Sequence, residues 1–246
     1  MKVFFHDDFY ESYTYDPAAE AGRMEAVMHA IKGRVRLVDA RPAAEEDIAA
    51  CHTGHHIEQV RREGLYEIAA LAAGGAIQAA ETGLTEPAFA LIRPPGHHAS
   101  ADSSWGFCYF CNMAVALSKL KRDGKIKKAF ILDFDLHFGD GNVNILGNSG
   151  YVDILNPSSY DRNSYLREVE QSLPDDADII GISAGFDNHE QDWGGVLATE
   201  DYREMGRMVR DASRQSGGGC FAILEGGYNH RVLGKNVMAL IEGMEG

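Results

Sequence analysis

The sequence predicts a single α/β domain in which a mostly parallel central sheet lies between two layers of helices. The chain has 246 residues, which fills one such domain well and is short for two. Short apolar runs rich in β-branched residues alternate with longer segments of helical periodicity, as in doubly wound α/β proteins. The runs are apolar on both faces, which is typical of buried parallel strands. No internal repeat or linker marks a boundary, so residues 1–246 are predicted to form one domain.

The predicted elements follow one another in regular alternation along the chain. The apolar, β-branched runs predict strands at 2–6, 35–40, 88–92, 129–134, 151–155, 178–183 and 220–224. Segments with helical spacing of apolar residues predict helices at 17–31, 44–51, 54–62, 65–81, 110–122, 162–172, 200–214 and 232–243.

Charge and hydropathy exclude some classes of function. The formal net charge of −14 argues against a nucleic-acid-binding surface, which needs basic patches. The one basic cluster, 119–128, is interpreted as a solvated helix end that runs into a strand. No apolar run approaches the roughly 20 residues of a membrane helix, and the N-terminus turns acidic too soon for a signal peptide. A cytoplasmic protein that binds neither membrane nor nucleic acid is therefore expected.

The four cysteines predict packed thiols. Cys108 and Cys111 form a single CxxC pair, and no second pair exists to complete a structural zinc site. Cys220 begins an apolar run and is expected in the core. Four cysteines in a chain of this length form no disulfide framework, which favours a reducing compartment.

Polar, ionisable residues follow four of the predicted strands. They are His97 and His98; Asp133, Asp135 and His137; Asp187; and the run from Glu225 to Tyr228. In open α/β sheets, ligands bind outside the carboxyl ends of the strands. The sequence therefore predicts that four separate segments bring their side chains to one site.

The run Asp133-Phe-Asp135-Leu-His137 indicates a metal site. Side chains at positions i, i+2 and i+4 of a strand project to one face. A carboxylate and an imidazole from this run, with Asp187 as a third ligand, suit zinc and leave an open position, and iron(II) is an alternative. Taken alone, the run is interpreted equally well as a polar strand end with satisfied hydrogen bonds.

Two further motifs suggest catalytic groups. The stiff turn Arg93-Pro-Pro-Gly-His97-His98 places two imidazoles together, as metal ligands or as a proton-transfer pair. The carboxylates of Asp133 and Asp140 are candidates to orient them.

In Glu225-Gly-Gly-Tyr228, the tyrosine hydroxyl is a candidate oxyanion donor, although a turn tyrosine packed on the sheet edge is the alternative. The other histidine pair, 55–56, lies in a polar helix and is expected at the surface.

Together these segments resemble the superfamily of zinc-dependent histone deacetylases and acetylpolyamine amidohydrolases, which has the arginase–deacetylase fold. The matching runs are RPPGHHA (93–99), WGFCYF followed by Asn112, DFDLHFGDGN (133–142), SAGFD (183–187) and EGGY (225–228). They occur in the order found in that superfamily and span most of positions 91–228.

The resemblance implies a role for each matching residue. Asp135, His137 and Asp187 correspond to the zinc ligands, and His98, paired with Asp140, to the general base that activates water and later protonates the leaving amine. His97, paired with Asp133, corresponds to its electrostatic partner, and Tyr228 to the group that polarises the carbonyl and holds the oxyanion. Phe107, with Gly106 before it, corresponds to the wall of the substrate tunnel. A structural potassium ion bound partly by the Asp133–Asp135 segment is also implied.

The chain departs from the pattern of that superfamily at several positions. The usual Gly-x-x-His-Pro-Glu run is absent, and Ala21-Gly22-Arg23-Met24 occupies the comparable region. A leucine that commonly lines the tunnel corresponds to Gly194, with Trp193 beside it as a candidate gate. The chain is shorter than most relatives, so trimmed loops around the mouth are expected. These changes affect substrate choice rather than chemistry at the metal.

The leading hypothesis is hydrolysis of an N-acetylated amine, either an acetyl-lysine side chain or a small substrate such as an acetylpolyamine. Hydrolysis of another acyl or guanidino substrate is a second enzyme hypothesis. A protein that binds acetylated amines without turnover is the non-enzymatic alternative. The sequence leaves the oligomeric state and the acyl chain open.

Overall fold

The computed structural model describes residues 1–246 and contains one seven-stranded sheet of order β2-β1-β3-β7-β6-β4-β5. Every neighbouring pair of strands is parallel, so the predicted α/β fold is confirmed and the sheet is parallel throughout. The strands are β1 Lys2–Phe5, β2 Arg36–Asp39, β3 Ala88–Ala90, β4 Ala129–Asp133, β5 Val152–Leu155, β6 Ile179–Ala184 and β7 Gly219–Leu224.

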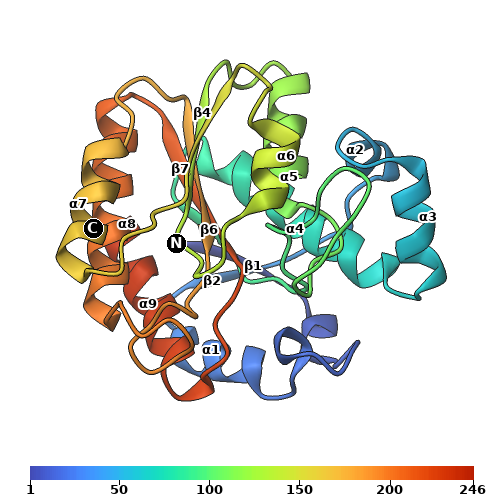
Figure 1. Cartoon of the computed structure of the whole chain (residues 1–246), viewed down its shortest axis with the longest axis horizontal. Helices are drawn as coiled ribbons and strands as arrows, with labels where there is room; N and C mark the ends of the chain where they lie inside the picture. Colours follow the sequence, from blue (N-terminus) through green and yellow to red (C-terminus); the bar gives the residue numbers. More distant parts are fainter.

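Helices cover both faces of the sheet. In Figure 1, α7, α8 and α9 lie on one side of the sheet, and α4, α5 and α6 lie on the other. The helices are α1 Arg23–Ile31, α2 Glu45–Ala49, α3 Gly54–Arg62, α4 Tyr66–Gly83, α5 Asn112–Arg122, α6 Asp140–Leu146, α7 Arg162–Ser172, α8 Thr199–Gln215 and α9 His230–Glu245. Two short 3-10 helices, η1 Asp7–Tyr10 and η2 Pro17–Ala19, precede α1.

One helical prediction needs correction, and one helix was not predicted. The helix expected at 17–31 is broken into η2 and α1, because Gly22 adopts φ 90° at the N-cap of α1, a backbone conformation that a continuous helix does not allow. Helix α6 was not predicted, since its seven residues carry too few apolar positions to give a helical period.

A main hydrophobic core of 61 buried residues accounts for the apolar strands, and a separate cluster of 7 buried residues lies where α3 meets α4. Every residue of β4 and β6 is buried, as expected for central strands with helices on both sides. All four cysteines are free and buried, which confirms the packed-thiol prediction. The basic cluster spans the end of α5 and the approach to β4, as predicted. No helix has both the length and the hydropathy that crossing a bilayer requires.

The prediction that the pair 55–56 lies at the surface is wrong for His56. Its side chain is buried, and its Nε2 atom lies 2.7 Å from the carbonyl oxygen of Tyr109. The reason is that His56 shares the buried face of α3 with Ile57 and Val60, which packs toward α4. The polar composition of α3 gave no indication of this buried face.

Candidate active site

The four chemistry-bearing loops leave the sheet side by side. Strands β3, β7, β6 and β4 are consecutive neighbours in the sheet, and they are in register at their carboxyl ends. Asp133 pairs with Ser183, and Ala184 with Leu224. The loops after these strands therefore begin next to one another, and the predicted convergence of four segments at one edge is observed.

Asp135, His137 and Asp187 form a cluster that suits a metal ion. Their candidate ligand atoms all lie within 4.8 Å of one another. The Nδ1 atom of His137 lies 3.2 Å from Asp135 Oδ1 and 3.1 Å from Asp187 Oδ2. Both carboxylates are buried, and Asp187 Oδ2 accepts no hydrogen bond of acceptable geometry. A buried carboxylate oxygen without a hydrogen-bond partner, beside two other side chains that can coordinate a metal, fits a divalent cation. Three protein ligands would leave one coordination position open.

The backbone that presents these ligands is not the extended strand that the sequence suggested. Strand β4 ends at Asp133, so Asp135 and His137 lie in the loop after it. Each aspartate side chain instead accepts a hydrogen bond from the amide two residues later, from Asp135 to Asp133 at 3.4 Å and from His137 to Asp135 at 3.0 Å. Each of these two successive Asx turns links residues two positions apart, which matches the spacing of the motif.

The charges within the cluster compete for protons. Burial, and then the nearby charge of Asp135, raise the pKa of Asp187 to about 6. Close contacts with the carboxylates of Asp135 and Asp187 raise the pKa of His137 to about 10. Burial opposes ionisation of Asp135, but His97 and His137 outweigh it and lower the pKa of that carboxyl. Two carboxylates that are forced together in this way favour a bound cation, whether a proton or a metal.

His97 and His98 form two histidine–aspartate pairs with opposite electrostatics. His97 Nδ1 lies 3.2 Å from Asp133 Oδ2, and His98 Nδ1 lies 2.7 Å from Asp140 Oδ1. Burial lowers the pKa of His97, but Asp135 and Asp133 more than offset it, and the pKa stays well above its ordinary value. Burial and the adjacent charge of His97 lower the pKa of His98 to about 4. The two environments thus favour opposite protonation states, the charged form for His97 and the neutral form for His98.

Tyr228 lies between aromatic rings at the same site. Its ring stacks on Trp193 at 4.1 Å between centroids and meets Phe107 edge-on at 6.0 Å. Burial, and then the charges of Asp135 and Asp187, raise the pKa of the Tyr228 hydroxyl, which therefore remains protonated and able to donate. Trp193 also lies edge-on to His137 at 6.1 Å, so its half-exposed indole stands beside the metal cluster and does not turn away from it.

Gly106 and Phe107 form a tight turn against His98. Their φ angles are 59° and 68°, and Phe107 is the only non-glycine residue of the chain with positive φ. A Cβ atom on Gly106 would lie 2.4 Å from His98 Cδ2, which no real side chain tolerates. The turn therefore needs glycine, and it directs the Phe107 ring toward Tyr228.

Two buried charged residues, to which sequence reasoning assigned no role, hold the site together. Glu225 accepts hydrogen bonds from the backbone amides of Gly96 at 2.7 Å and His97 at 3.3 Å, and so fixes the turn before the two histidines. Arg23 donates through Nε to the carbonyl of Gly227 at 2.9 Å and through a terminal nitrogen to that of Glu225 at 2.6 Å. A charged residue at the end of an apolar strand was the available signal for Glu225, whereas nothing in the sequence marked Arg23.

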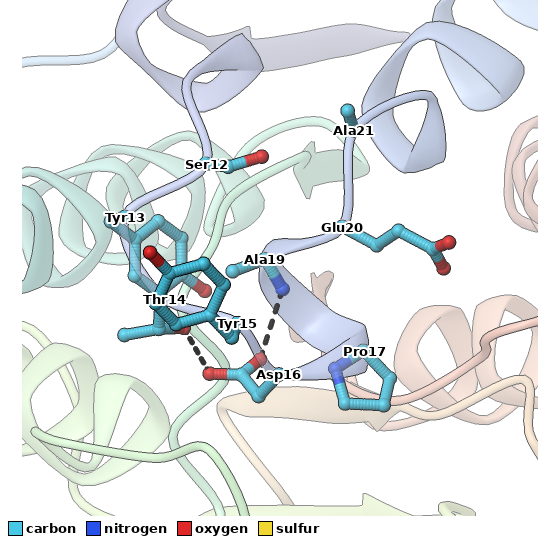
Figure 2. Close-up of a pocket in the computed structure, with 9 residues that line it drawn as sticks. All are labelled: Ser12, Tyr13, Thr14, Tyr15, Asp16, Pro17, Ala19, Glu20 and Ala21. Atoms are coloured by element: carbon cyan, nitrogen blue, oxygen red, sulfur yellow. Dashed lines mark hydrogen bonds between the residues drawn. The ribbon is translucent and has the colours of Figure 1, made fainter.

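A cavity of about 690 Å³ is lined by residues of the N-terminal segment Ser12–Ala21. Figure 2 shows its lining, in which Asp16 accepts hydrogen bonds from Thr14 and from the amide of Ala19. One lining residue, Glu20, lies 3.5 Å from His230, two residues beyond Tyr228. None of the metal-cluster side chains, nor His97 or His98, lines this cavity, so the chemistry is assigned to the cluster.

Comparison with known proteins gives one consistent result. Residues 62–165 and 157–244 match the family model described as the histone deacetylase domain. The chain is 29% identical over 304 residues to a probable deacetylase of Methanothermobacter thermautotrophicus, covering 99% of this chain and 91% of the relative. It is 31% identical over 274 residues to a probable deacetylase of Archaeoglobus fulgidus, covering 89% and 74%.

A solved structure supports the same fold. The crystal structure of the HDA15 HD domain superposes with a TM-score of 0.82 at 24% identity and covers 98% of this chain and 88% of that one. At this identity the likeness concerns the fold alone.

Proposed function

The chain belongs to the histone deacetylase family, and from this premise we propose that it is a metal-dependent amidohydrolase that removes acetyl groups from amines. The proposal rests on the geometry of the site: two neighbouring histidines, with 3.9 Å between their ring centroids, each contact an aspartate beside a three-residue metal cluster. Burial and the charge of His97 lower the pKa of His98, which favours its base form. Hydrolysis of an amide requires such a base, which later serves as an acid.

Asp135, His137 and Asp187 would hold the metal, which we propose to be zinc, with iron(II) as the alternative. When bound, the ion polarises the acetyl carbonyl and lowers the pKa of water beside it. A potassium ion near the Asp133–Asp135 segment is proposed as a structural ion of the same region.

We assign the proton transfers to His98. Its neutral imidazole accepts a proton from the attacking water, and the adjacent carboxylate of Asp140 stabilises the resulting imidazolium. The same proton then passes to the nitrogen of the leaving amine as the C–N bond breaks, which returns His98 to its base form. His97 keeps its proton throughout, and Asp133 balances its charge.

Tyr228 is proposed to stabilise the oxyanion that forms on the acetyl oxygen. Its hydroxyl is protonated, and it lies on a loop whose amides are fixed because Asp192 accepts hydrogen bonds from the backbone of Tyr228 at 2.8 Å and of Asn229 at 2.7 Å. A hydrogen bond that strengthens as negative charge develops lowers the barrier rather than the binding energy of the substrate.

The substrate is proposed to be an acetyl-lysine side chain or a small N-acetylated amine such as an acetylpolyamine. Phe107, Gly106 and Trp193 would line its path to the metal. The net charge of −14 favours substrates that carry further positive charges. A cytoplasmic location agrees with four free cysteines.

The test is acetate release by the purified protein from an acetyl-lysine peptide and from an acetylated polyamine, before chelation, after chelation and with zinc restored. We expect release that chelation abolishes and zinc recovers, and the ratio of the two rates identifies the substrate branch. A metal-loaded protein that binds either compound without releasing acetate would overturn the proposal and favour a binding protein instead.

A further inference from the structure

Trp105 covers the histidine that we propose as the general base. Its indole stacks on the His98 imidazole with 3.8 Å between ring centroids and 28° between planes. Its Nε1–H donates a 2.8 Å hydrogen bond to Oδ2 of Asp140, the carboxylate that also contacts His98. We infer that Trp105 is a positioning residue for the His98–Asp140 pair. This inference rests on the proposed function.

Each oxygen of the Asp140 carboxylate has its own donor. His98 Nδ1 lies 2.7 Å from Oδ1, and the indole nitrogen of Trp105 occupies Oδ2. A carboxylate held through both oxygens cannot rotate about its terminal bond without breaking one of the two contacts. The second donor therefore fixes the orientation of the first, and with it the direction in which His98 presents its free nitrogen.

His98 is also held on both faces. The His97 ring lies 3.9 Å from it on one face, so the Trp105 indole, at 3.8 Å, must occupy the other. The His98 side chain is 3% exposed, although Trp105 itself is 54% exposed and Asp140 is 32% exposed. The indole thus stands where water would otherwise reach the base. A half-exposed tryptophan loses favourable burial, which is consistent with a role in the site rather than in the core.

The backbone that follows Trp105 explains how one turn serves two purposes. Gly106 and Phe107 both have positive φ, which reverses the chain directly after the tryptophan. The indole folds back onto His98, and the next side chain but one points toward Tyr228. The base and the proposed oxyanion donor are therefore positioned by side chains from the same three-residue turn.

The experiment compares Trp105→Phe, which keeps an aromatic ring and removes the N–H, with Trp105→Leu, which removes both contacts. We expect kcat for acetate release to fall about fivefold in Trp105→Phe, the effect of one hydrogen bond to a partly exposed carboxylate. In Trp105→Leu we expect a fall of about 10- to 100-fold, because the base is displaced as well. KM should change less than about twofold in both, since neither contact involves the substrate. The graded loss distinguishes positioning from simple loss of fold.

The matched control is Tyr160→Leu, which removes another exposed aromatic ring, 90% exposed, outside the proposed machinery. It should leave kcat unchanged. A readout independent of activity uses Trp193→Phe, which leaves Trp105 as the only tryptophan of the chain. Adding His98→Ala to this background should shift the emission maximum of Trp105 to longer wavelength, because the face of the indole that the imidazole covers becomes exposed to water.

Wild-type kcat in both Trp105 variants would overturn the inference while the proposed function stands. Unchanged emission on removal of His98 would overturn the contact itself. A wild-type protein that releases no acetate from either substrate would overturn the proposed function, and the inference with it.

Discussion

Replacing Tyr228 with phenylalanine removes one oxygen atom and leaves the ring in place. The ring is held by stacking on Trp193 at 4.1 Å, by the edge of Phe107 at 6.0 Å and by the Arg23 guanidinium, whose central carbon lies 5.7 Å from the ring centroid. None of these contacts involves the hydroxyl. We therefore expect the melting temperature and the metal content of Tyr228→Phe to equal those of the wild type.

The loss of turnover should be large. The pKa of the hydroxyl is raised by burial and by the charges of Asp135 and Asp187, so the group remains a hydrogen-bond donor across the working pH range. Removing one donor to a developing oxyanion lowers kcat by about 10²- to 10³-fold, or about 3–4 kcal/mol. KM should change little, because the donor acts on charge that appears only in the transition state.

The assay is steady-state acetate release from the better of the two substrates, with Tyr160→Phe as the control at an exposed tyrosine. A kcat within about threefold of wild type in a folded, metal-loaded Tyr228→Phe would show that this hydroxyl is not the oxyanion donor. The mechanism would then have to place that donor elsewhere in the site.

Three further predictions follow from the site. In Gly106→Ala the new Cβ would lie 2.4 Å from His98 Cδ2, so kcat should fall more than about tenfold in a protein with unchanged circular dichroism, and wild-type kcat would contradict the tight turn. Since the pKa of metal-free His137 is about 10, binding of zinc at pH 8 should release about one proton, seen as a binding heat that varies with the ionisation enthalpy of the buffer, whereas a constant heat would contradict it. Burial raises the pKa of Glu225 from 4.5 to about 7, so the folded state binds this proton more tightly than the unfolded state does, and the resulting stability is lost as pH rises through about 7. When the pH rises from 4.5 to 8, the free energy of unfolding measured in urea should therefore fall by about 3 kcal/mol less in Glu225→Gln than in the wild type. Parallel pH dependences of the two proteins would refute this.

The sheet and the convergence of the four loops were predictable because buried parallel strands have continuous apolar sequences. Polar residues directly after such runs must emerge at one edge. The predicted pairings of His97 with Asp133 and of His98 with Asp140 are observed as direct contacts. The roles assigned to these residues stay proposals until they are measured.

Other features depended on contacts that no local pattern encodes. The interactions of Arg23 with the loop of Tyr228 join residues about 200 positions apart, and a charged residue at a helix start gives no sign of full burial. The position of the Trp105 indole depends on two consecutive residues with positive φ, Gly106 and Phe107. Only the glycine indicates such a backbone conformation in the sequence. The strand periodicity proposed for the aspartate motif was replaced by Asx turns, which produce the same spacing from a different backbone.

We propose that one metal ion, held by Asp135, His137 and Asp187, supports amide hydrolysis by the histidine pair beside it. It is tested most directly by adding zinc in known amounts to metal-stripped protein and measuring the rate of acetate release at each step. We expect a rate near zero without metal and a linear rise that saturates at about one zinc per chain. Acetate release that persists in fully stripped protein, or that stays absent once zinc has saturated the site, would contradict it.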